Sequence, residues 1–137
     1  MTTAIEYAPP VERFAFDYGQ TYDSYLITEA DREYFWSSER RGVIGFSRRG
    51  YQVHAMGGLL TAEDHREELL REFLAFTSEN RLTATFYNIP RADLQLFRQY
   101  GFQTSKLGEE PIVRLDRTCW QGSSYRWVRR QESYCSR

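Results

Sequence analysis

The distribution of hydrophobic and polar residues predicts alternating helices and strands. Apolar residues recur every three or four positions over residues 11–18, after Pro9-Pro10, which predicts a short amphipathic helix ending at Gly19. Four extended segments follow, each rich in β-branched or aromatic residues and separated by turn residues: 24–28, 33–37, 42–47 and 51–56. These short spacings favour an antiparallel meander.

In the second half of the chain the spacing of hydrophobic residues alternates between that of helices and that of strands. Gly57-Gly58 is expected to end the meander, and Thr61 to cap a long helix that runs to about Asn80. Further elements are then predicted in this order: a strand at 82–87, a short helix after Pro90 that ends at Gly101, extended runs at 102–107 and 112–115, and a last helix from Ser123 or Ser124 to near Tyr134. The order predicts an α+β fold with mixed α/β layers, in which helices flank a central twisted, mostly antiparallel sheet. The GCN5-related N-acetyltransferase (GNAT) fold has the same order.

The amino-acid composition limits the class of protein and the compartment in which it folds. The chain has 137 residues, of which 41% are hydrophobic and 16% aromatic, so it has enough apolar material for one folded domain, and this composition argues against disorder. No apolar run is long enough to span a membrane and no export signal is seen. Cys119 and Cys135 show neither metal spacing nor a disulfide framework, which favours a reducing cytoplasm. Cys119, Trp120 and Trp127 are expected to pack around the last helix.

The charge is unevenly distributed. Residues 1–113 hold 12 basic and 17 acidic side chains, a net charge of −5, whereas residues 114–137 hold 6 arginines and 2 acids, a net charge of +4. Arg126, Arg129 and Arg130 are predicted to lie on one side of the last helix. A basic side of this kind can bind phosphate groups, or it can be a solvated helix face.

Other candidate chemistry is weaker. Gly57-Gly58 lacks the spacing of a pyrophosphate-binding loop, and the acids that follow would repel a phosphate, so neither coenzyme A nor another cofactor is expected. His54 and His65 have no partner at ligand spacing, so no metal site and no catalytic residue is predicted. Glu109-Glu110 could be an acid/base pair or an ammonium site, but a turn in which an acid pairs with Lys106 is favoured.

A family pattern covers nearly the whole chain. The segment 86–115 contains Phe86-Tyr87, Gly101-Phe102 and the run Lys106-Leu107-Gly108-Glu109-Glu110, and upstream stand Tyr18-Gly19 and Ser24-Tyr25-Leu26. These residues resemble the soluble domain of bacterial phosphatidylglycerol lysyltransferases and their relatives. The chain departs from that pattern at Gly57-Gly58-Leu59, where the family often has Gly-Asp-Pro.

The resemblance implies two GNAT folds in tandem that transfer an aminoacyl group from aminoacyl-tRNA to a lipid or other acceptor. It implies that residues 1–122 are the first fold, and that residues 123–137 are a basic helix leading toward a second fold that carries the transfer site. Beside that second fold, Arg126, Arg129 and Arg130 could bind tRNA phosphates or anionic lipid, or they could form a solvated face or salt bridges to it, and the sequence leaves these alternatives equal. We therefore expect the polypeptide to continue past residue 137 and this half to be inactive alone. Two alternatives stay open: a non-catalytic interaction or dimerisation module and, with less support, an acyl-coenzyme A transferase.

Overall fold

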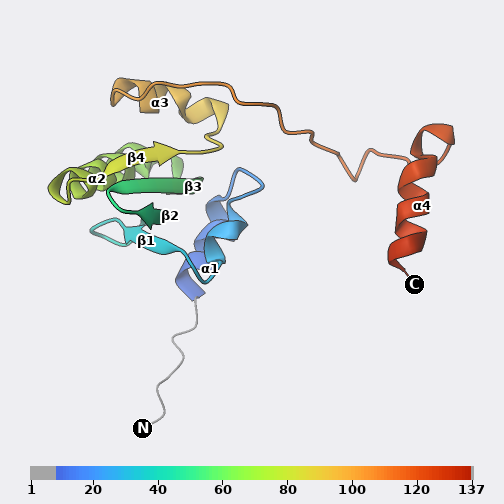
Figure 1. Cartoon of the computed structure of the whole chain (residues 1–137), viewed down its shortest axis with the longest axis horizontal. Helices are drawn as coiled ribbons and strands as arrows, with labels where there is room; N and C mark the ends of the chain where they lie inside the picture. The colour runs from blue at the N-terminus through green and yellow to red at the C-terminus, as the bar shows by residue number, and fades with distance from the viewer. Residues whose placement is uncertain (1–8, 137) are drawn as a thin grey trace, which may run out of the picture. The chain divides into compact units, whose positions relative to one another are not determined.

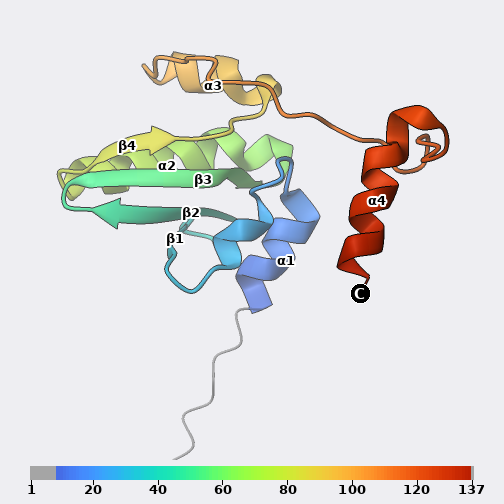
Figure 2. The same cartoon turned by 45° about the vertical axis from the view of Figure 1, so that its right-hand side comes forward.

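The computed structural model describes residues 9–136, which form two compact units. The first unit ends at Thr104 and the second begins at Ser105 (Figures 1 and 2). The division predicted at residue 122 stays a prediction. Helix α1 (Pro9–Tyr18) opens the described chain and ends before Gly19, as its apolar spacing predicts.

A four-stranded sheet organises the first unit. Its strands are β1 (Glu33–Trp36), β2 (Gly42–Arg49), β3 (Gln52–Thr61) and β4 (Thr83–Phe86), in that spatial order. The first three pair antiparallel, and β4 pairs parallel with β3, with Ala55 opposite Phe86. Helix α2 (Arg66–Glu79) makes the crossover between the parallel strands. The predicted α+β architecture with a mostly antiparallel sheet is confirmed.

The sheet separates two hydrophobic clusters, because neighbouring residues of a strand point to opposite faces. Ile44 and Phe46 of β2 pack with α2, whereas Val43 packs with Val11 and Ala15 of α1. Phe73 of α2 is fully buried on the first face. Helix α3 (Leu94–Gln99) places Phe97 in the same cluster, and Figures 1 and 2 show this helix beside β4. The sheet is therefore covered on both faces.

Strand β3 does not end at Gly57-Gly58, as predicted, but continues to Thr61. Val43 pairs with Leu60 and Gly45 with Met56, so residues 57–59 lie opposite Ile44 alone. Gly57 and Gly58 have φ angles of +81° and +79°, a backbone conformation that glycine adopts at low cost. The two glycines thus form a β-bulge inside the strand rather than a break.

The start of the long helix also differs from the prediction. Thr61 is the last residue of β3, and its hydroxyl donates to the carbonyl of Arg41 at 2.8 Å, so it caps no helix. A 3₁₀ turn, η2 (Glu63–His65), precedes α2. The side chain of Arg66, the first residue of α2, pairs with Asp93 of the turn η3 (Arg91–Asp93) at 2.9 Å. This ion pair connects the first turn of α2 to the start of α3.

Residues 24–28, predicted as a strand, instead contain the 3₁₀ helix η1 (Tyr25–Thr28). Ile27 of η1 is fully buried and fills the space that Gly45 and Gly57 leave open, since a Cβ at either glycine would come within 2.7 Å of its side chain. The Tyr34 hydroxyl donates to the carbonyl of Ile27 at 2.6 Å. Packing against two glycines therefore overrides the β-propensity of this segment.

Gly101 ends α3 with a φ of +84°, as predicted, but residues 102–116 contain no strand. The predicted strands at 102–107 and 112–115 are thus wrong for this structure. Leu107, Ile112 and Leu115 are exposed, so no buried face fixes a strand register. In the second unit the chain regains regular structure at η4 (Ser123–Tyr125) and α4 (Arg126–Cys135), which confirms the predicted last helix.

Candidate functional site

The basic helix α4 carries the three arginines singled out by the sequence, and their environments differ. Arg129 donates from Nη1 to the carbonyl of Trp120 at 2.6 Å, which ties the helix to the preceding loop. For Arg126 and Arg130 the described part of the chain provides no ion pair or side-chain hydrogen bond. They are four residues apart, so their guanidinium groups are neighbours on the helix surface. Arg126 and Arg130 are therefore the two arginines of α4 available to an anion.

Aromatic residues of the second unit do not all pack as the sequence predicts. Trp127 is 70% exposed and Tyr134 is 57% exposed, and Cys119 is exposed as well. Trp120 and Tyr125 are half-buried, with their ring centroids 5.4 Å apart. The expectation that Trp127 packs around the last helix is wrong for this structure.

The family motif lies in the exposed segment before α4. Lys106 pairs with Glu109 through its Nζ atom, while Glu110 is exposed beside it and Gly108 has open space around the position of a Cβ. Because Glu109 is engaged by a lysine three residues away, the geometry favours a turn stabilised by a surface ion pair. It does not bring Glu109 and Glu110 together as an acid/base pair.

The glycines and histidines considered as candidates for cofactor or metal binding lie in β3 and in the turn η2. Gly57 and Gly58 belong to a bulge within β3, and α2 begins only at Arg66, with Glu67 and Glu68 in its first turn. His54 lies beside Tyr87, with a ring centroid distance of 6.0 Å. Within residues 9–136 there is no group of three His, Cys, Asp or Glu side chains that could hold a metal ion.

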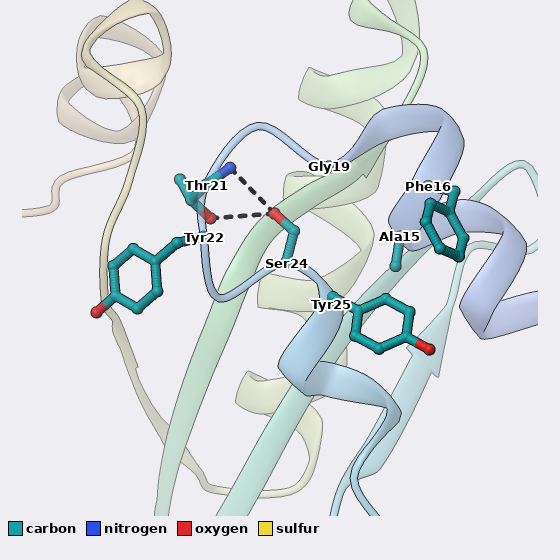
Figure 3. Close-up of a pocket in the computed structure, with 7 residues that line it drawn as sticks. All are labelled: Ala15, Phe16, Gly19, Thr21, Tyr22, Ser24 and Tyr25. Carbon is teal, nitrogen blue, oxygen red and sulfur yellow. Dashed lines mark hydrogen bonds between the residues drawn. The ribbon is translucent and has the colours of Figure 1, made fainter. Parts of the chain in front are cut away.

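A pocket of about 310 Å³ between α1 and η1 was missed by the sequence analysis. Figure 3 shows Phe16 and Tyr25 together on one side, with ring centroids 5.3 Å apart, and Tyr22 on the far side of the loop. The lining consists of small and aromatic side chains with several hydroxyls: Ala15, Phe16, Gly19, Thr21, Tyr22, Ser24 and Tyr25. Gly19, Ser24 and Tyr25 of the family pattern line this pocket, and that pattern is the signal in the sequence that could have located it.

The wall of this pocket is fixed by a hydrogen-bond network. Asp23 is buried and accepts hydrogen bonds from the Thr21 hydroxyl and from Nδ2 of Asn88, the latter at 3.0 Å. The Ser24 hydroxyl donates to the carbonyl of Gly57 at 3.0 Å. The Tyr25 hydroxyl donates to Glu12, and this hydrogen bond raises the pKa of the Tyr25 phenol above its usual value. With no carboxylate or imidazole in its described lining, the pocket suits binding of an apolar group rather than catalysis.

No helix in the described part of the chain is long and apolar enough to cross a membrane.

Comparison with known proteins places these features in a family. Phosphatidylglycerol lysyltransferase of Staphylococcus aureus is 25% identical over 118 residues, which are 86% of this chain and 14% of that protein. The protein of the same name from Staphylococcus epidermidis is 27% identical over 112 residues, covering 82% of this chain and 13% of that one. The chain thus spans about one seventh of the length of these relatives.

Solved structures show the same fold. L-PGS from Bacillus licheniformis is 27% identical and superposes with a TM-score of 0.73 over 90% of this chain and 40% of its own. The C-terminal domain of a putative lysylphosphatidylglycerol synthetase from Agrobacterium fabrum has a TM-score of 0.75 at 18% identity, covers 91% of this chain and 39% of its own, and shows likeness of fold alone. The architecture is accordingly GNAT-like. A family model described as phosphatidylglycerol lysyltransferase, C-terminal, matches residues 13–137. The chain belongs to this family of phosphatidylglycerol lysyltransferase C-terminal domains.

Proposed function

We propose that this chain is the first GNAT-like half of a transferase domain that moves an aminoacyl group from aminoacyl-tRNA to a phospholipid in the cytoplasm. The observation that carries the proposal is the family match over residues 13–137, which extends through α4. The chain corresponds to 40% of the Bacillus licheniformis L-PGS chain, as expected of one fold of a pair. In this account the catalytic groups lie outside the chain.

The geometry of the described residues is in keeping with a supporting role. His54 lies in β3 and His65 in the turn η2, and the acids of the family motif are exposed on a turn. What the chain offers instead is a sheet packed on a hydrophobic core, a pocket between α1 and η1 with a mainly apolar lining, and a basic helix. These features suit positioning and binding. We assign Arg126 and Arg130 of α4 to contact with an anion, and we assign tRNA binding to the complete protein.

The test is a transfer assay with the longest natural polypeptide that contains residues 1–137. Radiolabelled lysyl-tRNA and phosphatidylglycerol vesicles are supplied, and labelled lipid is extracted and counted. We expect labelled lipid from the longer polypeptide and none from residues 1–137 alone. The proposal is contradicted if the longer polypeptide forms no aminoacyl lipid with lysyl-tRNA or with a mixture of aminoacyl-tRNAs. Transfer by residues 1–137 alone would instead place the catalytic groups within this chain.

A further inference from the structure

Helix α4 presents aromatic and basic side chains side by side on its surface. Trp127 and Tyr134 are seven residues apart, so they lie on one face of the helix. Arg130 stands three residues after Trp127 and four before Tyr134, and therefore adjoins both. Arg126 is one turn before Arg130. The result is a surface, formed by Arg126, Trp127, Arg130 and Tyr134, in which all four side chains are exposed.

A bilayer surface that contains anionic lipid matches both parts of this surface. Arginines beside a membrane are attracted to its negatively charged head groups, and tryptophan and tyrosine rings favour the boundary between head groups and acyl chains. A helix with a strongly polar face and aromatic residues beside it is typical of segments that lie in the plane of that boundary. Glu132 is the one acid of α4, so the charge of the helix is complementary to an anionic surface.

Aliphatic side chains elsewhere in the second unit favour a membrane over a nucleic acid. Leu107, Ile112 and Leu115 are between 74% and 87% exposed, and Val113 is 54% exposed. RNA would use the arginines for its phosphates and could stack bases on Trp127, but it has no apolar region to receive aliphatic groups. The acyl region of a bilayer receives both kinds of apolar side chain.

We propose that the surface of Arg126, Trp127, Arg130 and Tyr134 docks α4 on the head-group region of a membrane containing anionic phospholipid. The inference rests on the proposed function and deepens it, since it names the part of the chain that meets the membrane of the acceptor lipid. Each arginine at an anionic surface contributes about 5.5-fold to partitioning. Both together contribute about 30-fold.

Sedimentation of residues 1–137 with vesicles tests the proposal. Vesicles of phosphatidylglycerol and phosphatidylcholine are compared with vesicles of phosphatidylcholine alone, at low and at high salt. We expect binding to the anionic vesicles only, and weaker binding at high salt because charge attraction is screened. The Arg126→Gln/Arg130→Gln variant should lose about 30-fold in partition coefficient, and Trp127→Ser should also bind more weakly.

Matched controls come from the β2–β3 turn of the first unit. Arg48→Gln/Arg49→Gln removes two exposed charges, and Tyr51→Ser removes an aromatic ring that is 66% exposed. Both controls should bind vesicles as the unaltered chain does. Circular dichroism of every variant checks that the fold is kept.

Three results would overturn the inference. The first is equal binding to both kinds of vesicle, and the second is unchanged binding by the α4 variants. The third is loss of tRNA binding, or of a lipid-free dimer, in the α4 variants while vesicle binding persists, which would assign the surface to RNA or to a second copy. The sedimentation test and the transfer assay can fail separately. If the transfer assay yields labelled lipid but the chain does not bind vesicles, this inference alone is refuted. If the chain binds vesicles but the transfer assay yields no labelled lipid, the proposed function alone is refuted.

Discussion

Replacement of Asp93 by alanine is expected to lower the free energy of unfolding by about 3–5 kcal/mol. The side chains of Arg66 and Asp93 are only 12% and 7% exposed, and their atoms Nη1 and Oδ1 are 2.9 Å apart. Nε of Arg66 is also buried and has no hydrogen-bond partner within the described structure. Without Asp93 the guanidinium of Arg66 would remain buried with no opposing charge, and a buried unpaired charge strongly destabilises the folded state.

Urea unfolding of Asp93→Ala, Arg66→Met/Asp93→Leu and Asp17→Ala measures this effect. The double variant removes both charges and should lie closer to the unaltered chain than Asp93→Ala does, because no unpaired charge remains. Asp17 pairs with Arg13 on the surface, where both side chains are more than half exposed, so its removal should cost no more than about 1 kcal/mol. An equal decrease in the free energy of unfolding for Asp93→Ala and Asp17→Ala would show that burial does not determine the strength of the Arg66–Asp93 pair.

Alanine at Gly57 is expected to destabilise the chain more than alanine at Gly58. Both glycines have φ near +80°, so either substitution forces a side chain into a left-handed conformation at a cost of about 1–2 kcal/mol. At Gly57 the new Cβ would also lie 2.6 Å from Cγ2 of Ile27, an overpacking that costs about 1–3 kcal/mol more. At Gly58 nothing lies within 4 Å of that position.

The difference between the two variants therefore isolates the contact with Ile27. Combining Gly57→Ala with Ile27→Ala checks the cause, because an alanine side chain lacks the Cγ2 atom that the new Cβ would approach. In urea unfolding the added cost of Gly57→Ala should shrink in the Ile27→Ala background. Equal stability of Gly57→Ala and Gly58→Ala would contradict the packing of η1 against the β3 bulge.

Periodicity predicted the elements that have a buried face. The β1–β2–β3 meander, α1, α2 and β4 follow from alternation and helical spacing because each has a face buried in one of the two hydrophobic clusters. The same reasoning failed where long-range packing determines the conformation. Residues 25–28 have strand-like composition, yet Ile27 is drawn into the space beside Gly45 and Gly57 as part of a 3₁₀ turn.

Local rules also misplaced two boundaries. Thr61 has the side chain of an N-cap, but its hydroxyl bonds to the carbonyl of Arg41 across the sheet, a partner 20 residues away that no local pattern reveals. The sequence predicts a break at Gly57-Gly58, although a pair of glycines permits a bulge equally well. At the candidate site, the sequence predicted the position of the arginines of α4. It did not predict that the side chain of Arg129 is hydrogen-bonded within the described chain while those of the other two are not, since the bond of Arg129 to the Trp120 carbonyl depends on how the loop folds back.

Steady-state lysyl transfer by the longest natural polypeptide, unaltered and carrying Arg126→Gln/Arg130→Gln, is the decisive measurement. Initial rates are measured while phosphatidylglycerol vesicles and lysyl-tRNA are varied in turn. We expect transfer by the unaltered protein and, for the variant, a raised KM for the vesicles with an unchanged KM for lysyl-tRNA. A KM raised for lysyl-tRNA alone would contradict the assignment of α4 to the membrane. No transfer by the unaltered protein would contradict the proposed function of this chain.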